Sequence, residues 1–198
     1  MKFISPYITF EAKKHRKVDL IIHGYGANSE ECFYPWLKRK LENLGYKVEL
    51  PSLPNADRPN ADEQVEYILE NYPNKKDIII SHSFGTCVAM KLVEKFDYEF
   101  DSLFLVAGFI DHNFTFTDEE EIEILSQGCD WEFNFDDIKS KTNVYILRPE
   151  TDSEISLEQT ESLAEAFDEP IHFFKEKEDH ACGEKEPEVF KFIKDIIR

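Results

Sequence analysis

Hydrophobic and polar positions along the chain form two alternating patterns. Short runs of mainly apolar residues recur at 18–24, 46–51, 76–81, 101–108, 142–149 and 169–174. Most are apolar on both faces, which is typical of strands that helices cover on both sides of a sheet. The segments between them have the periodicity of amphipathic helices. The pattern therefore predicts an α/β fold, a three-layer α/β/α sandwich with a mostly parallel central sheet.

Helix start signals precede several of these intervening segments. Asn60 and Ser156 are each followed three residues later by Glu or Gln, the spacing of a capping box. Ser29 precedes a helical pattern that ends at Gly45, and a last amphipathic pattern covers 186–198. We expect active-site residues where the strands end, because parallel sheets bind ligands at their carboxyl edge.

The segment 111–141 interrupts the alternation and is both acidic and aromatic. It predicts either a surface excursion with one or two short helices or a rim over a site, since it leaves the carboxyl end of the run 101–108. The chain has no internal repeat and no long Gly/Ser linker. We therefore expect residues 1–198 to form a single domain.

The charge balance excludes some partners. The 198 residues carry a net charge of −18, with 41% hydrophobic residues. Such acidity disfavours nucleic acid, whose phosphates need clustered Lys and Arg, and disfavours anionic membrane surfaces. We expect a globular protein that binds neither, and composition gives no protein partner.

The four cysteines, Cys32, Cys87, Cys129 and Cys182, lack the spacing of a zinc site. Reduced thiols in a cytoplasmic protein are the simplest interpretation. Residues 1–17 lack the apolar core of a signal peptide, and no apolar stretch is long enough to span a membrane. We expect a cytoplasmic protein without a metal or an organic cofactor.

Ser83 is the candidate nucleophile. It lies in "SHSFG", close to the G-x-S-x-G nucleophile elbow, between an apolar strand pattern and the helical pattern "GTCVAMKLVEKF". The strand and helix cross closely in such an elbow, so the positions two before and two after the serine must be small. Gly85 meets this requirement, and Ser81 replaces the usual glycine.

The candidate base and acid follow in the chain. Of six histidines, His180 is the one that follows the last strand pattern and precedes the last helix. Asp152 comes at the end of the run 142–149, where it could orient the imidazole. Glu150 and Asp111 remain alternatives for the acid.

Backbone N–H groups are expected to stabilise the oxyanion that forms when a serine attacks a carbonyl. Phe84, directly after the nucleophile, supplies one candidate amide. Tyr25, in the glycine-rich loop "HGYGANSEE" after the first strand pattern, supplies the other. The alternative interpretation of this loop is an ordinary glycine turn between a strand and a helix, which is compatible with the same conformation.

Together these residues resemble the α/β-hydrolase superfamily, and more closely the small serine hydrolases related to retinoblastoma-binding protein 9. The resemblance covers 18–197 and includes "HGYG", "SHSFG", Asp152 and His180. It implies a minimal hydrolase without a large cap domain that uses Ser83, Asp152 and His180 on ester substrates. The acid loop "PETDSEIS" departs from the group's pattern, and the L-x-C-x-E motif of the namesake is absent, so its protein partner is not inferred.

The sequence thus predicts a serine hydrolase that cleaves a small carboxylic ester or thioester through an acyl-enzyme on Ser83. A catalytically silent binding or scaffolding protein and an acyltransferase are the alternatives. Glu176, Glu178 and Asp179 lie close to His180 in sequence, and negative charge favours its protonated form. We therefore expect kcat/KM to rise into the alkaline range, and anionic substrates to react more slowly than neutral ones.

Overall fold

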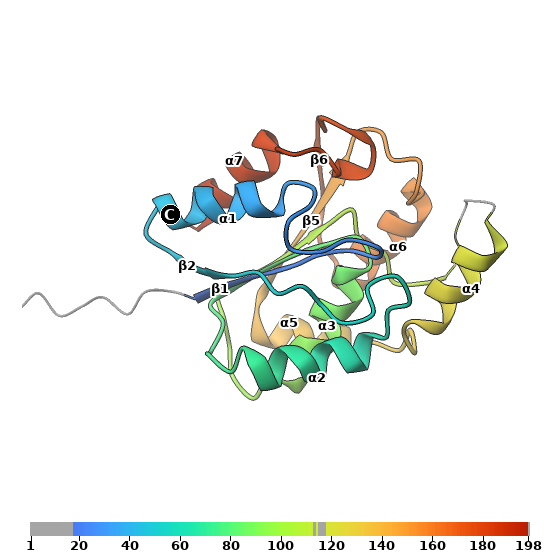
Figure 1. The fold of residues 1–198 in the computed structure, drawn as a ribbon, viewed down its shortest axis with the longest axis horizontal. Coiled ribbons are helices and arrows are strands. Elements are labelled where there is room, and N and C mark those ends of the chain that lie inside the picture. The colour runs from blue at the N-terminus through green and yellow to red at the C-terminus, as the bar shows by residue number, and fades with distance from the viewer. Residues whose placement is uncertain (1–17, 113, 115–117, 198) are drawn as a thin grey trace, which may run out of the picture.

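The computed structural model, which describes residues 18–112, 114 and 118–197, contains a parallel six-stranded sheet (Figure 1). Its strand order is β2-β1-β3-β4-β5-β6, and every neighbouring pair is parallel. The predicted fold class is confirmed. The strands are β1 Val18–Ile22, β2 Lys47–Glu49, β3 Ile78–His82, β4 Ser102–Val106, β5 Asn143–Pro149 and β6 Ile171–Phe174.

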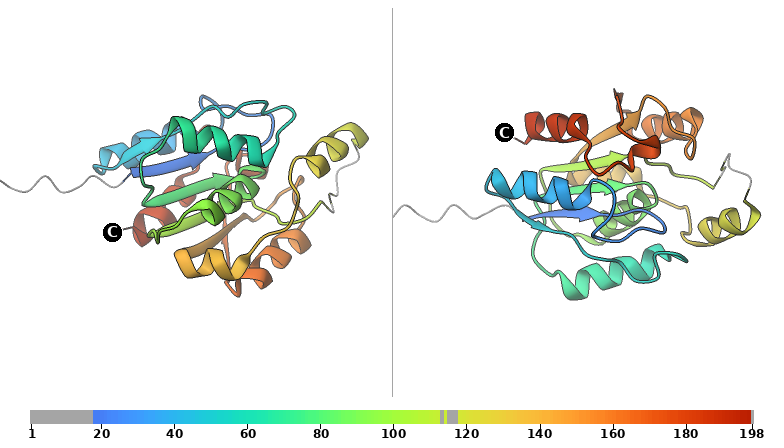
Figure 2. Two further views of the ribbon diagram at one scale, coloured as in Figure 1. Left: turned by 90° about the horizontal axis from the view of Figure 1, so that it is seen from below. Right: turned by 45° about the horizontal axis from the view of Figure 1, so that its top comes forward.

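Helices cover both faces of the sheet, with α1 and α7 on one side and α2, α3, α5 and α6 on the other (Figures 1 and 2). Successive β3 residues alternate between the layers: Ile78 and Ile80 pack toward α1 and α7, and Ile79 packs toward α3. This explains the unbroken isoleucine run. The helices of the two layers are α1 Tyr34–Asn43, α2 Ala61–Asn71, α3 Gly85–Lys95, α5 Phe135–Lys141, α6 Leu157–Phe167 and α7 Pro187–Ile196.

Two predicted helix caps are present. The Asn60 side chain accepts the N–H of Glu63 at 3.0 Å, and Ser156 with Gln159 forms a reciprocal capping box. Ser29 does not cap α1, because residues 29–33 form turns and its backbone N–H donates to Ser52. The predicted start of this helix was therefore wrong.

The segment 111–141 contains two short helices, as expected: α4 Glu119–Gln127 and α5. α4 stands beyond the carboxyl edge of the sheet (Figures 1 and 2), and Asp118 caps it by accepting two backbone N–H groups. Residues 1–17, where we expected no signal peptide, lie outside the described residues. Within the described part of the chain, no helix combines the length and the apolar character needed to cross a membrane.

Candidate active site

Ser83 occupies the sharp turn between β3 and α3 with a backbone φ of 53°, in the left-handed region. A non-glycine residue adopts this conformation at an energetic cost that the surrounding structure must offset. The backbone N–H of Ser83 donates to the carbonyl of Val106 at 3.0 Å, which extends the β3–β4 ladder past the strand. The turn therefore lifts the serine out of the sheet at its carboxyl edge.

Two glycines permit the close packing around this turn. A Cβ on Gly85 would lie 2.4 Å from the carbonyl oxygen of His23, and a Cβ on Gly24 would lie 2.9 Å from Cβ of Ser83. A side chain at either position would displace the backbone of β1 or the nucleophile turn. The departure at Ser81 is accommodated, because its hydroxyl donates to the Phe104 carbonyl at 3.1 Å inside the sheet.

His180 and Asp152 face each other at the same edge. Both carboxylate oxygens of Asp152 lie 3.0 Å from Nδ1 of His180. The Asp152 side chain is fully buried, and one of its oxygens also accepts the N–H groups of Glu154 and Ile155. This geometry places the donating proton on Nδ1 and leaves Nε2 as the proton acceptor of the neutral ring.

The environment of His180 has opposing effects on its pKa. Burial lowers it, whereas the hydrogen bond and charge of Asp152 and the charges of Glu154 and Asp179 raise it, with a net rise above the ordinary 6.5. Glu154 Oε2 lies 3.3 Å from Nε2. The carboxylates around the imidazole therefore favour its protonated form more than burial disfavours it.

The rival acids have other contacts. Glu150 is exposed and its backbone N–H donates to Glu176, while an Asp111 oxygen lies 3.4 Å from the side-chain nitrogen of Gln159. Among the described residues, Asp152 is the carboxylate that bonds Nδ1 of His180. The geometry favours Asp152 for the acid, and the assignment of the three residues as a catalytic triad stays a prediction.

A cavity of about 100 Å³ lies beside Ser83 and His180. Ser83 and His180 line it together with Tyr25 and Phe84, the residues predicted to supply oxyanion amides. Its wall also includes Glu121 and Leu125 from α4. α4 therefore forms part of a rim over the site, and Trp131, which follows α4, packs on Phe84 and Phe109.

Sequence reasoning missed a chain of buried hydrogen bonds that links three loops of the site. The Gly24 N–H donates to the Tyr34 hydroxyl at 3.3 Å, this hydroxyl lies 2.7 Å from Nδ1 of His82, and Nε2 of His82 donates to the His180 carbonyl at 2.8 Å. Burial and the neighbouring His180 lower the pKa of His82 to about 3, so this ring is neutral. Nε2 then carries its proton, and the tyrosine donates to Nδ1.

Two buried charged residues that were not singled out from the sequence hold the loops that carry Asp152 and His180. Arg148 donates to the carbonyls of Ile155 and Ser156 and to the hydroxyl of Thr160, which fixes the loop that carries Asp152. Glu186 accepts the Lys177 N–H, at 3.1 Å to each oxygen, in the loop that carries His180. For Arg148, the available sequence signal was a charged residue at the end of an apolar strand pattern, since arginine is seldom buried without partners.

The expectation of four reduced thiols is wrong for one pair. A disulfide joins Cys32, before α1, to Cys182, two residues after His180. The two are 150 positions apart in the sequence, and the fold brings their Cα atoms to 4.7 Å. Spacing rules compare cysteines that are close in the sequence, so they could not predict a bond between the loop after β1 and the loop after β6. Cys87 and Cys129 are free.

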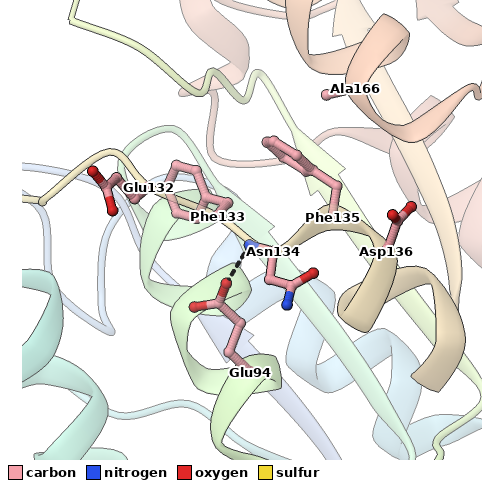
Figure 3. A pocket seen from close by; sticks show the side chains of 7 residues that line it. All are labelled: Glu94, Glu132, Phe133, Asn134, Phe135, Asp136 and Ala166. Atoms are coloured by element: carbon pink, nitrogen blue, oxygen red, sulfur yellow. Dashed lines mark hydrogen bonds between the residues drawn. The ribbon is translucent and has the colours of Figure 1, made fainter.

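A larger and more open hollow, of about 610 Å³, lies between the end of α3, the segment 132–136 and α6 (Figure 3). It is lined by Glu94, Glu132, Phe133, Asn134, Phe135, Asp136 and Ala166, none of which is a predicted site residue. The Asn134 N–H donates to Glu94 at 2.6 Å across it. No group of three or more His, Cys, Asp or Glu residues in the described part of the chain is placed to hold a metal ion.

The chain has relatives of known fold. Residues 20–144 match the family model of the alpha/beta hydrolase fold, a range that includes Ser83 and ends before Asp152 and His180. The Bacillus subtilis protein YdeN, which is named as a hydrolase, is 26% identical over 93 residues, 45% of this chain and 49% of YdeN. That alignment therefore spans about half the length of the curated relative.

Solved structures extend the likeness to almost the whole chain. The crystal structure of YdeN has a TM-score of 0.78 at 18% identity and covers 91% of this chain and 98% of its own. Two esterases have the same fold. Polyneuridine aldehyde esterase has a TM-score of 0.65 at 16% identity and covers 93% of this chain and 100% of its own. An Arabidopsis methylesterase has a TM-score of 0.66 at 12% identity and covers 91% of this chain and 98% of its own. The chain belongs to the alpha/beta hydrolase fold family.

Proposed function

We propose that the protein is a serine hydrolase that cleaves small carboxylic esters or thioesters through an acyl-enzyme on Ser83. The observation that carries the proposal is the juxtaposition of three groups. Ser83, on a strained turn, shares a cavity with His180, and Nδ1 of His180 lies 3.0 Å from both oxygens of a buried Asp152.

In the proposed reaction, neutral His180 accepts the Ser83 proton at Nε2 as Oγ attacks the substrate carbonyl. Asp152 holds the imidazole by its Nδ1 proton and stabilises the imidazolium. The backbone amides of Tyr25 and Phe84 bind the oxyanion. The imidazolium then protonates the departing alcohol or thiol, and a water molecule activated by the same base releases the acid.

The relatives support ester chemistry, since two structures of the same fold are named as esterases. The narrower resemblance to the hydrolases related to retinoblastoma-binding protein 9 stays a prediction. So does a cytoplasmic location, and the disulfide gives it a test. Cytosolic reductants keep most thiols reduced, so Cys32 and Cys182 should be recovered as thiols from a cytosolic fraction.

The test is covalent labelling with a fluorophosphonate probe, read by intact mass and peptide mapping. Wild type should gain one adduct on Ser83, and Ser83→Ala should gain none. Ser140→Ala, which removes an exposed serine hydroxyl from α5 outside the cavity, is the matched control and should label like wild type. Absence of labelling in wild type, or an equal adduct on Ser83→Ala, would overturn the proposal.

A silent binding protein is the second candidate, because Glu154 lies 3.3 Å from the very nitrogen that the mechanism needs. It predicts that neither wild type nor Glu154→Gln reacts with the probe. An acyltransferase would share the acyl-enzyme. Added alcohol would then capture the acyl group in preference to water, which product analysis distinguishes.

A further inference from the structure

The walls of the candidate site carry two carboxylates. Glu121, from α4, and Glu154, from the loop after β5, line the cavity that also holds Ser83 and His180. Burial and the charges of Glu154 and Asp118 raise the pKa of Glu121, which places these carboxylates in one another's field. No Lys or Arg is among the described residues that line the cavity.

Two cations from adjacent elements are already engaged. Arg58 pairs with Glu120 at 2.7 Å, and the buried guanidinium of Arg148 donates to carbonyls of the acid loop. Within the described ranges, no ion pair joins Glu121 to a Lys or Arg, and the ion-pair partner of Glu154 is His180. The negative charge of the cavity is therefore not balanced by the chain that lines it.

A second, independent observation points to a ligand at this position. Nε2 of His180 belongs to a side chain that is only 5% exposed, and it has no hydrogen-bond partner in the described structure. Glu154 is within ion-pair distance at 3.3 Å without meeting hydrogen-bond geometry. A buried polar atom without a partner costs free energy unless a ligand or solvent bonds it. His180 lines the cavity, so a ligand bound there can supply that bond.

The position of Glu154 identifies the part of the substrate that it faces. When the acyl-enzyme forms, the Ser83 Oγ–carbon bond is made, the ester carbon–oxygen bond breaks, and the leaving oxygen takes the proton from Nε2 of His180. A carboxylate 3.3 Å from Nε2 is therefore close to the position at which the leaving oxygen takes its proton. A positive charge a few bonds from the ester oxygen would lie close to it.

Resting on the proposed function, we propose that the site selects esters whose leaving group is a cationic amino alcohol, with Glu154 and Glu121 as the counter-charges. The selectivity is electrostatic, so it acts on cations in preference to neutral groups of the same shape. It also rejects anionic leaving groups more strongly than neutral ones.

The test compares two acetates of matched shape, 2-(trimethylammonio)ethyl acetate and its neutral isostere 3,3-dimethylbutyl acetate. Wild type should show a kcat/KM ratio of about tenfold in favour of the cation, and the ratio should shrink as salt is raised from low to high ionic strength. Glu121→Gln and Glu154→Gln should each reduce the ratio a few-fold, and the double variant should bring it to about one.

Glu123→Gln is the matched control, because it removes one carboxylate from the same helix at an exposed position outside the cavity. Its ratio should equal that of wild type. If neither acetate is turned over, the two corresponding alcohols give the same comparison. Choline should then protect Ser83 from probe labelling better than 3,3-dimethylbutan-1-ol does. A ratio near one in wild type, or a ratio that the double variant leaves unchanged, overturns the charge proposal.

Failure of the proposed function gives a different result. In that case the fluorophosphonate probe leaves Ser83 unlabelled in wild type and in Glu121→Gln. If Ser83 is labelled but the two acetates have equal kcat/KM, only the proposed selectivity is rejected.

Discussion

At the scale of single residues, the site depends on how each imidazole is held. His180 is buried but surrounded by carboxylates, and the buried His82 bonds the His180 carbonyl. Two histidines whose rings are 4.9 Å apart therefore have pKa values shifted in opposite directions. One can exchange a proton in the physiological range, while the other stays neutral and holds the loop.

The pH profile should follow from the raised pKa of His180. Catalysis needs the neutral imidazole, so kcat/KM should rise with pH through a midpoint above 6.5. The carboxylates that raise it are Asp152, Glu154 and Asp179, whereas Glu176 bonds the backbone of Glu150. The sequence-based expectation of a raised His180 pKa thus had the right direction, but of the three carboxylates that it named only Asp179 is among these causes. The pH profile itself stays a prediction.

Glu154→Gln should move this midpoint to lower pH, because it removes one of these charges without touching the acid. The pH dependence of kcat/KM on a neutral ester measures it. Glu123→Gln should leave the midpoint in place, and a midpoint that does not fall in Glu154→Gln would contradict the assigned cause.

Asp152→Asn should reduce kcat by about 10³- to 10⁴-fold, because an amide no longer fixes the productive tautomer of the histidine. Glu150→Gln, two positions earlier and exposed, should change kcat less than about twofold. Steady-state kinetics on one ester compares the two. A large loss in Glu150→Gln with a small loss in Asp152→Asn would exchange their roles.

Tyr34→Phe should destabilise the protein by about 1–3 kcal/mol, because it leaves the buried Nδ1 of His82 and the N–H of Gly24 without a partner. Urea unfolding measures the change. Tyr145→Phe, at a ring that packs on Phe104, is the control and should stay within about 0.5 kcal/mol of wild type. Equal stability of the two variants would show that the hydrogen-bond chain contributes nothing.

At the scale of elements, the crossing of β1, β3 and α3 positions Ser83, the proposed nucleophile. Gly85→Ala should cost at least about 2 kcal/mol, because its Cβ would lie 2.4 Å from the carbonyl oxygen of His23 and 2.8 Å from that of Ile22, at the end of β1. Ser81→Gly, at the other small position of the elbow, should cost no more than about 1 kcal/mol. Thermal or urea unfolding compares the two, and an unaffected Gly85→Ala would contradict the packing argument.

The disulfide between the first and last loops should stabilise the folded chain. Reduction should lower the free energy of unfolding by about 2–5 kcal/mol, because the bond closes a loop of 150 residues. Cys32→Ser should lose the same amount and become insensitive to reductant, whereas Cys129→Ser should respond to reductant like wild type. Urea unfolding with and without dithiothreitol, with peptide mapping of the bridge, tests this.

At the scale of the whole molecule, the net charge limits the partners, and the strand order determines which loops meet. The net charge of −18 disfavours polyanionic partners, and the structure adds that two of the carboxylates line the candidate site. The strand order places β3 inside the sheet between β1 and β4. The turn at Ser83 and the loops that carry Tyr25, Asp152 and His180 therefore meet at one edge of the sheet.

Local patterns were sufficient to predict the layers, the elbow at Ser83 and the candidates Asp152 and His180, because apolar periodicity and turn residues act over a few positions. Contacts between distant positions were not predictable in this way. The bond between Cys32 and Cys182, the hydrogen bonds from Tyr34 through His82 to His180, and the presence of Glu121 and Glu154 in one cavity all depend on which loops share the sheet edge. Strand order and the position of α4 decide that, and both follow from packing between elements that are distant in the sequence.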